Sequence, residues 1–238
     1  MANRKEQKEK LRQERLAREA AADQAAQRKK LVGYGAAAVL VLAAIVAVVV
    51  VAVAGGGDSS GGTHQAQAPE EAEPGTPEVS YGDGAAIPEQ QEFDLRAAAR
   101  AASCRLEDPP EEGNTHTEGE VEYRANPPTS GDHHPIATAD GAYSIRPKVE
   151  NSVHSLEHGR IHIQFKPDLP QEQIDQLKAL FDEDPYHMLI YPNADLPVPV
   201  AATTWNHALL CESFSPQVFD AIRAFRDQYR DQGPEFVP

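Results

Sequence analysis

The pattern of apolar and polar residues along this chain changes abruptly at residues 31 and 55. Residues 31–54, LVGYGAAAVLVLAAIVAVVVVAVA, contain no charged side chain. As a helix this segment would be about 36 Å long, enough to cross a hydrocarbon core of about 30 Å. A helix satisfies its own backbone hydrogen bonds in lipid, so the pattern predicts one transmembrane helix over residues 31–54.

The following residues, 55–88, are rich in Gly, Ser, Pro and acidic side chains and offer almost nothing to bury. Such a composition cannot offset the entropy lost on ordering, so we expect a disordered, flexible linker. Residues 89–238 return to periodic apolar patterns and are long enough to form one domain with its own core.

Four segments of this domain place apolar residues at helical spacing. Gly159 is expected to close the second helix, and Ser215 is expected to cap the fourth. The segments are EFDLRAAARAASC (92–104), VENSVHSLEHG (149–159), PQEQIDQLKALFDED (170–184) and SPQVFDAIRAFRDQYRDQG (215–233).

Other segments have the pattern of strands. In RIHIQF (160–165), Ile161, Ile163 and Phe165 share one face, and His162 has the opposite parity. Helices and strands in this order predict an α+β fold, a small mixed sheet with packed helices. The remaining strand predictions are YHMLIY (186–191), a strand within VPVAATTWNHALLCES (198–213), and the alternation that begins GEVEYRANPPTSGDHHP (119–135).

Charge is distributed unevenly along the chain. Residues 1–30 carry ten Lys/Arg and five acidic residues, whereas the whole chain has a formal net charge of −15. Arg28, Lys29 and Lys30 directly precede the apolar segment. The positive-inside rule therefore places residues 1–30 in the cytoplasm as a charged tail, and the domain on the extracytoplasmic side of a bacterial cell membrane. Nucleic acid is not an expected partner, because the only basic segment is small and cytoplasmic.

The alternative for the apolar segment is a cleaved signal peptide. Ala52, Val53 and Ala54 resemble a cleavage site of small residues, but the apolar run is longer than a signal h-region and its basic region is long. We therefore expect an uncleaved signal-anchor.

The chain has two cysteines, Cys104 and Cys211. In an oxidising compartment such a pair is most simply a disulfide, here one joining the first helix of the domain to its last strand. A thiolate metal or redox pair is the alternative, and the absence of a C-x-x-C motif disfavours it.

Histidines in two motifs carry the candidate chemistry. His154 and His158 lie one turn apart on a predicted helix, and His133 lies in a loop stiffened by prolines. With His116 and Glu157 they form a candidate site of nitrogen and carboxylate ligands, which suits Zn or Cu(II).

Two other interpretations remain open. The segment His154–His158 also matches the H-x-x-E-H motif of zinc peptidases, but Gly159 ends the helix at once and the domain is small. Alternatively, the two imidazoles are structural groups at a helix C-terminus, in a non-catalytic envelope scaffold with unknown protein partners. Enzymatic activity is not the favoured prediction.

The segments NPPTSGDHHP, VHSLEHGRIHIQF, TTWNH and DQYRDQGPE resemble a family of membrane-anchored bacterial proteins catalogued as domain of unknown function 3105. The resemblance covers nearly all of residues 95–235. The family pattern N-P-P-T-S-G-x-H falls on His133, and H-x-L-E-H-G falls on His154, Glu157 and His158. His116 matches a further family histidine. His134 stands where the family has an aromatic residue, which implies either an extra ligand or a different surface residue. The resemblance implies no activity.

Overall fold

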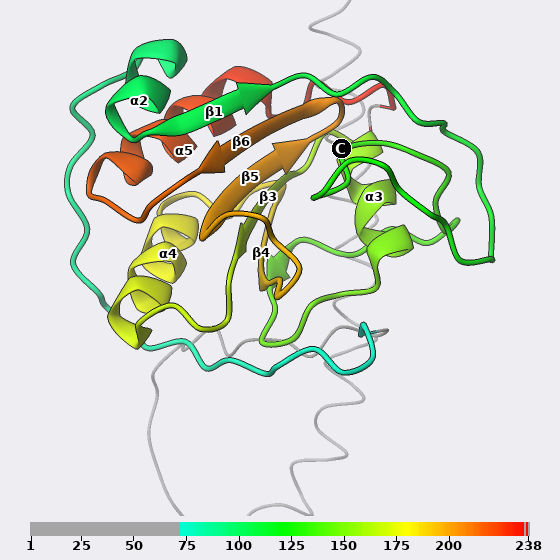
Figure 1. Cartoon of the computed structure of the whole chain (residues 1–238), viewed down its shortest axis with the longest axis horizontal. Coiled ribbons are helices and arrows are strands. Elements are labelled where there is room, and N and C mark those ends of the chain that lie inside the picture. Colours follow the sequence, from blue (N-terminus) through cyan, green and yellow to red (C-terminus); the bar gives the residue numbers. More distant parts are fainter. Residues whose placement is uncertain (1–71, 236, 238) are drawn as a thin grey trace, which may run out of the picture. The chain divides into compact units, whose positions relative to one another are not determined.

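The computed structural model describes residues 72–235 and residue 237 (Figure 1). The tail over residues 1–30, the transmembrane helix over 31–54 and the first part of the linker, 55–71, lie outside the described residues. Within the described part of the chain, no helix is both long enough and apolar enough to cross a bilayer.

A six-stranded sheet in the order β1-β6-β5-β3-β4-β2 forms the centre of the domain. β4 pairs in parallel with β2 and β3, and the other pairs are antiparallel. The expected mixed α+β fold is therefore confirmed. The strands are β1 (Cys104–Glu107), β2 (Gly141–Ala142), β3 (Ile161–Phe165), β4 (Met188–Pro192), β5 (Val200–Thr204) and β6 (His207–Cys211).

One face of the sheet is covered by α2 (Leu95–Ala101), α4 (Gln171–Glu183) and α5 (Gln217–Tyr229). Their apolar residues form one continuous core with Ile161, Ile163 and Phe165 of β3, all three of which are fully buried. Strand side chains alternate between faces, so this set of β3 residues is the one that the sequence pattern places on a common face.

The opposite face meets α3 (Val149–Glu157). His162 of β3 points to this face, where its Nε2 lies 2.8 Å from the Ser155 hydroxyl and its Nδ1 lies 3.0 Å from the Tyr191 hydroxyl. The opposite parity of His162 is confirmed, although the residue is buried and not turned to solvent. Val153 and Leu156 of α3 pack on Trp205 in the turn between β5 and β6.

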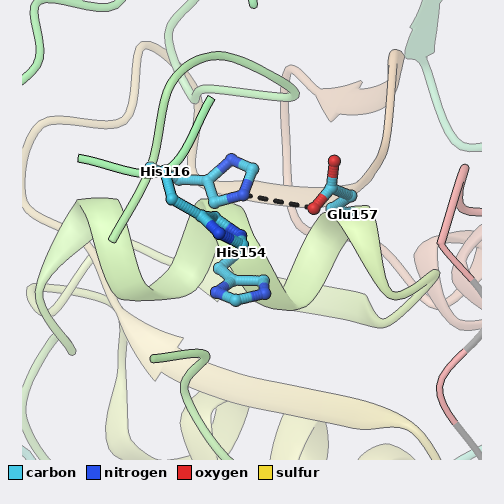
Figure 2. A group of neighbouring side chains, drawn as sticks. His116, His154 and Glu157 are labelled. Carbon is cyan, nitrogen blue, oxygen red and sulfur yellow. Dashed lines mark ion pairs between the residues drawn. The ribbon is translucent and has the colours of Figure 1, made fainter. Parts of the chain in front are cut away.

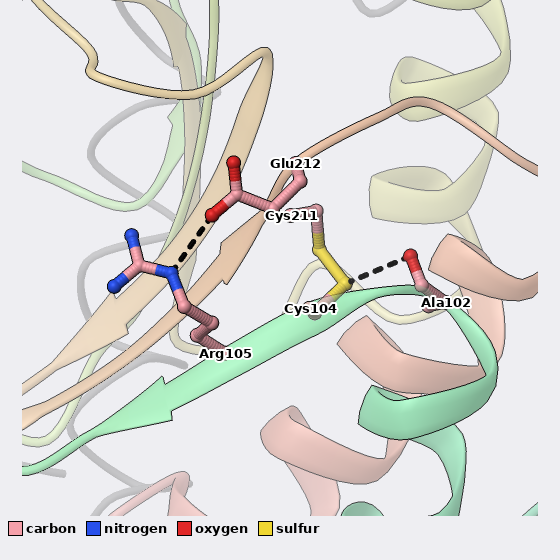
Figure 3. The surroundings of a disulfide bond; sticks show 5 residues. All are labelled: Ala102, Cys104, Arg105, Cys211 and Glu212. Atoms are coloured by element: carbon pink, nitrogen blue, oxygen red, sulfur yellow. Dashed lines mark hydrogen bonds and ion pairs between the residues drawn. A yellow bond between two sulfur atoms is a disulfide. The ribbon is translucent and has the colours of Figure 1, made fainter.

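Cys104 and Cys211 form the expected disulfide (Figure 3). They are direct partners in the antiparallel register of β1 and β6, and an Arg105–Glu212 ion pair of 2.8 Å lies beside them. Cys104 belongs to a strand that the sequence did not predict, so the disulfide joins two neighbouring strands and not a helix and a strand.

The described part of the predicted linker, residues 72–88, lies against the domain. Val79, Tyr81 and Ile87 pack on the core, and the Tyr81 hydroxyl donates to the Tyr143 carbonyl at 2.9 Å. The Val79 amide also bonds the Ser144 carbonyl. Composition predicts a flexible linker here because apolar residues are few. Those few, spaced among prolines and acids, nevertheless anchor the stretch to the domain.

Two local predictions are wrong. Residues 119–123 form no strand, because carboxylates bind the amides of this region: Glu150 accepts from Val121, and Glu112 accepts from Arg124. Ser215 also does not cap α5 with its side chain. Pro216 is the N-cap residue, and the Ser215 carbonyl accepts from the Val218 amide.

Candidate metal centre

Two loops and helix α3 meet at the histidines that the sequence singled out. The loops around His116 and His133 run in parallel and form a short bridge. The Thr117 amide donates to the His133 carbonyl at 2.7 Å, and the His133 amide donates to the Thr115 carbonyl at 3.0 Å. This pairing brings the His116 and His133 rings to a centroid separation of 5.0 Å.

The loop that carries His133 is held tightly in place. A Cβ at Gly131, whose φ is +136°, would lie 2.6 Å from the Tyr123 ring. The Tyr123 hydroxyl in turn donates to the Asp132 carbonyl at 2.8 Å. Trp205 packs edge-on against His133 with ring centroids 6.1 Å apart, so the turn between β5 and β6 supports the loop from behind.

The ring of His133 is fully buried and its tautomer is fixed. Its Nδ1 lies 2.8 Å from the Gly131 carbonyl, which can only accept, so Nδ1 carries the proton in the neutral ring. Nε2 then keeps a free lone pair. This atom is buried and has no hydrogen-bond partner of standard geometry among the described residues, although the Glu157 Oε2 lies 3.2 Å away.

His154 projects from the last turn of α3 and has the same arrangement. Its Nδ1 donates to the His134 carbonyl at 2.7 Å, which again leaves Nε2 as the lone-pair atom. Burial lowers the pKa of His154 to about 4, and the neighbouring histidines act in the same direction. The imidazole is therefore neutral at pH 7, the form that binds a metal.

Glu157 follows His154 by three residues, so both side chains leave the same side of α3. Its Oε2 lies 3.2 Å from the His133 Nε2, the contact drawn as a dashed line in Figure 2. Burial raises the pKa of Glu157, and the nearby His133 opposes that rise.

These four residues form one compact group. One ligand atom from each of His116, His133, His154 and Glu157 lies within 4.8 Å of every other. His133, His154 and Glu157 are 0 %, 5 % and 8 % exposed, whereas His116 is open to solvent. The group, hereafter the inner set, is therefore a nearly buried cluster with one surface side.

The structure does not place His158 in the inner set. His158 belongs to a second group with His154 and Glu235, hereafter the outer set, in which the ligand atoms again lie within 4.8 Å of one another. The His158 Nε2 lies 3.5 Å from the Glu235 Oε2. Burial lowers the pKa of His158, and Glu235 opposes that change.

Sequence reasoning missed Glu235. It lies 77 residues after His158, and nothing in local spacing links the two. The available signal is the segment DQYRDQGPE, which ends at Glu235 and is one of the segments that carry the family resemblance.

The remaining histidines of the domain have ordinary structural partners. His134 contacts the Asn151 side-chain amide through Nδ1 and belongs to neither set. His187 and His207 each lie 2.6 Å from an aspartate, Asp231 and Asp108 respectively.

The donor atoms of the inner set fit a borderline or hard transition-metal ion. Three imidazoles and a carboxylate are the usual ligands of Zn and Cu(II). Both cysteines are in the disulfide, and Met188 is buried in the core, so neither set contains a sulfur ligand. The unpartnered Nε2 of His133 is the atom that an ion would satisfy.

Comparison with known families gives one match. A family model described as "Protein of unknown function (DUF3105)" matches residues 114–237, which include both sets of candidate ligands. No curated protein and no solved structure matches the chain.

Proposed function

The chain belongs to the DUF3105 family, whose description assigns no activity. From the geometry of the inner set we propose that its domain binds one transition-metal ion, Zn or Cu(II), for handling or storage. The inner set supplies the Nε2 atoms of His133 and His154, an imidazole nitrogen of His116, and a carboxylate oxygen of Glu157. When bound, the ion would supply positive charge to a cluster that otherwise leaves a buried lone pair unsatisfied.

The observation that carries this proposal is the shared orientation of two buried rings. His133 and His154 each donate Nδ1–H to a backbone carbonyl, which leaves Nε2 as the lone-pair atom of the neutral ring, and the His133 Nε2 lies 3.2 Å from a carboxylate oxygen of Glu157. Outer hydrogen bonds of this kind fix the tautomer and direction of metal-binding histidines. The buried His162, by contrast, has both ring nitrogens bonded to hydroxyls.

We further propose that the protein is a single-pass membrane protein of the bacterial cell envelope. The uncharged segment 31–54 would anchor it, with the basic tail in the cytoplasm and the domain outside. The Cys104–Cys211 disulfide supports this location, because disulfides persist mainly in oxidising compartments.

The proposal is tested on the full-length chain, purified in detergent and stripped with a chelator. We expect elemental analysis after addition of Zn²⁺ or Cu²⁺ and dialysis to give one ion per chain. His133→Ala and His154→Ala should abolish retention. His207→Asn, which removes an imidazole outside both sets, should retain the ion. Absence of retained metal in the unmutated chain would instead favour the scaffold function.

A second candidate function, metal-dependent hydrolysis, is favoured by one observation. Glu235 provides the distant carboxylate that an H-x-x-E-H zinc site needs alongside His154 and His158. However, Glu157, the residue that would act as base, is directed at His133. A hydrolase also needs a substrate cleft at its metal site, and two surface clefts, of about 870 and 590 Å³, have no histidine in their lining. Zn-dependent cleavage of a fluorogenic peptide, lost in Glu157→Gln with zinc retained, would support this function.

A further inference from the structure

His154 is a member of both the inner and the outer set. Its ring lies 4.8 Å from the His133 ring and 4.4 Å from the His158 ring, measured between centroids. The two sets therefore meet at one side chain and are not separate sites.

His154 can serve only one ion at a time. Its Nδ1–H is committed to the His134 carbonyl at 2.7 Å, so the neutral ring has a single lone pair, at Nε2. An imidazole bridge between two ions would require that proton to leave and that hydrogen bond to break. An ion held by the inner set and an ion held by the outer set thus compete for the same atom.

The two sets differ in exposure. Apart from His154, the outer set consists of half-buried His158 and exposed Glu235. The inner set has two further ligands, His133 and Glu157, that are almost completely buried, and a third, His116, that is exposed. An ion arriving from solvent therefore reaches the outer carboxylate and imidazole more easily than it reaches His133 and Glu157.

Glu235 is held at this position by the segment after α5. The Glu235 amide donates to the Glu157 carbonyl at 3.2 Å, and the Asp231 amide donates to the Gly159 carbonyl at 2.9 Å. Arg160 also donates to the Val237 carbonyl at 2.8 Å. The first two bonds satisfy carbonyls at the C-terminal end of α3, and together the three hold the segment that carries Glu235 beside His158.

We infer that the outer set is an entry site, at which His158 and Glu235 capture a divalent ion that His154 then shares with the inner set. The inference rests on the proposed function. It adds a second binding position and an order of events: capture at the surface, exchange at His154 Nε2, and retention beside His133. It also fixes the stoichiometry at one ion per chain.

The test uses Zn²⁺ as the probe and the full-length, metal-free chain. Stopped-flow mixing with a chromogenic zinc chelator measures the rates of uptake and release. We expect Glu235→Gln and His158→Asn to slow both rates about tenfold, which corresponds to a barrier higher by about 1.4 kcal/mol. The equilibrium affinity should change less than the rates. Glu172→Gln, which removes an exposed carboxylate on α4, is the matched control and should behave as the unmutated chain.

Each result separates the two proposals. If the unmutated chain binds no Zn²⁺, the proposed function fails and the entry site fails with it. If it binds one ion but Glu235→Gln and His158→Asn leave both rates unchanged, only the entry site is refuted. Two ions bound per chain would also refute it, because His154 would then not be a shared ligand.

Discussion

The two faces of the sheet are built from the same strands but have different roles in the structure. On one face, Ile161, Ile163 and Phe165 pack with apolar residues of α2, α4 and α5 in one core. On the other, His162 and Gln164 of the same strand join a buried network of hydroxyl and amide groups. The first face stabilises the domain by removing apolar area from water. The second positions α3, which carries the candidate ligands.

The polar face also contains two kinds of histidine. His162 has a hydroxyl on each nitrogen, and because Ser155 donates to the Ser152 carbonyl, His162 donates to Ser155 and accepts from Tyr191. His133 and His154 have a carbonyl on Nδ1 and nothing that satisfies Nε2 in the same way. The hydrogen bonds of the ring nitrogens therefore distinguish His162 from the two candidate ligands.

The largest loss of stability is expected from truncating a side chain in the apolar core. Phe225→Ala removes a fully buried ring of α5 and should lower the free energy of unfolding by about 3–5 kcal/mol through lost burial and a residual cavity. Urea denaturation measures the change. A loss below about 1 kcal/mol would contradict this prediction and show that neighbouring side chains can move to fill the cavity.

Removing the disulfide at the edge of the sheet should have the next largest effect. Cys104→Ala with Cys211→Ala frees a loop with a sequence separation of 107 residues and should cost about 2–4 kcal/mol of stability. Because the disulfide lies away from α3, zinc retained per folded molecule should not change. Loss of zinc binding in folded protein would contradict that independence.

Lowering the pH should destabilise the domain through the buried imidazole of His162. Burial lowers the pKa of His162 from 6.5 to about 3. The unfolded chain therefore takes up this proton below pH 6.5 while the folded chain does not. Stability is complete above pH 6.5 and should fall by about 1.4 kcal/mol per pH unit as the pH decreases toward 3.

The control for this pH dependence is His162→Gln, which retains donor and acceptor atoms but does not titrate. Denaturation curves between pH 7 and pH 5 should be less pH-dependent in His162→Gln than in the unmutated chain. Since His154 also has a lowered pKa, some dependence should remain in the variant. Equal slopes in the two proteins would contradict the assignment to His162.

The smallest effect on the metal-free fold is expected at the surface of the inner set. His116→Ala removes an exposed ring and should change stability by no more than about 0.5 kcal/mol without metal. The increase in melting temperature on addition of Zn²⁺ should, however, decrease, because a ligand that binds only the folded state stabilises it in proportion to its affinity. An unchanged increase would remove His116 from the set.

Local pattern was sufficient for most of the fold. The alternation of RIHIQF predicted β3, the amphipathic spacing of residues 170–184 predicted α4, and Gly159, with φ of +77°, ends α3 as expected. Short strands were missed because β1 and β2 have four and two residues, too few to show a period. The apparent strand at 119–123 fails because its amides meet carboxylates and not a neighbouring strand.

The candidate site was predictable only in part. His154 and Glu157 share a helix turn, so their proximity follows from spacing alone. The approach of His116 to His133 depends on a bridge between two loops, and that of Glu235 to His158 depends on the docking of the segment after α5. Such contacts are tertiary, and local spacing in one sequence carries no signal for them. For the same reason spacing alone groups His158 with the other candidate ligands, whereas the structure places it in the outer set.

The contact between Gly159 and Gly233 has an evolutionary consequence. A Cβ on Gly159 would lie 2.8 Å from the Asp231 Cα, and a Cβ on Gly233 would overlap the Glu157 carbonyl and the Gly159 amide nitrogen. Neither position can therefore acquire a side chain while the two segments keep their spacing. In related sequences we expect these two glycines to be retained together or replaced together, so that the motif at residue 159 and the motif at residue 233 are inherited as one unit.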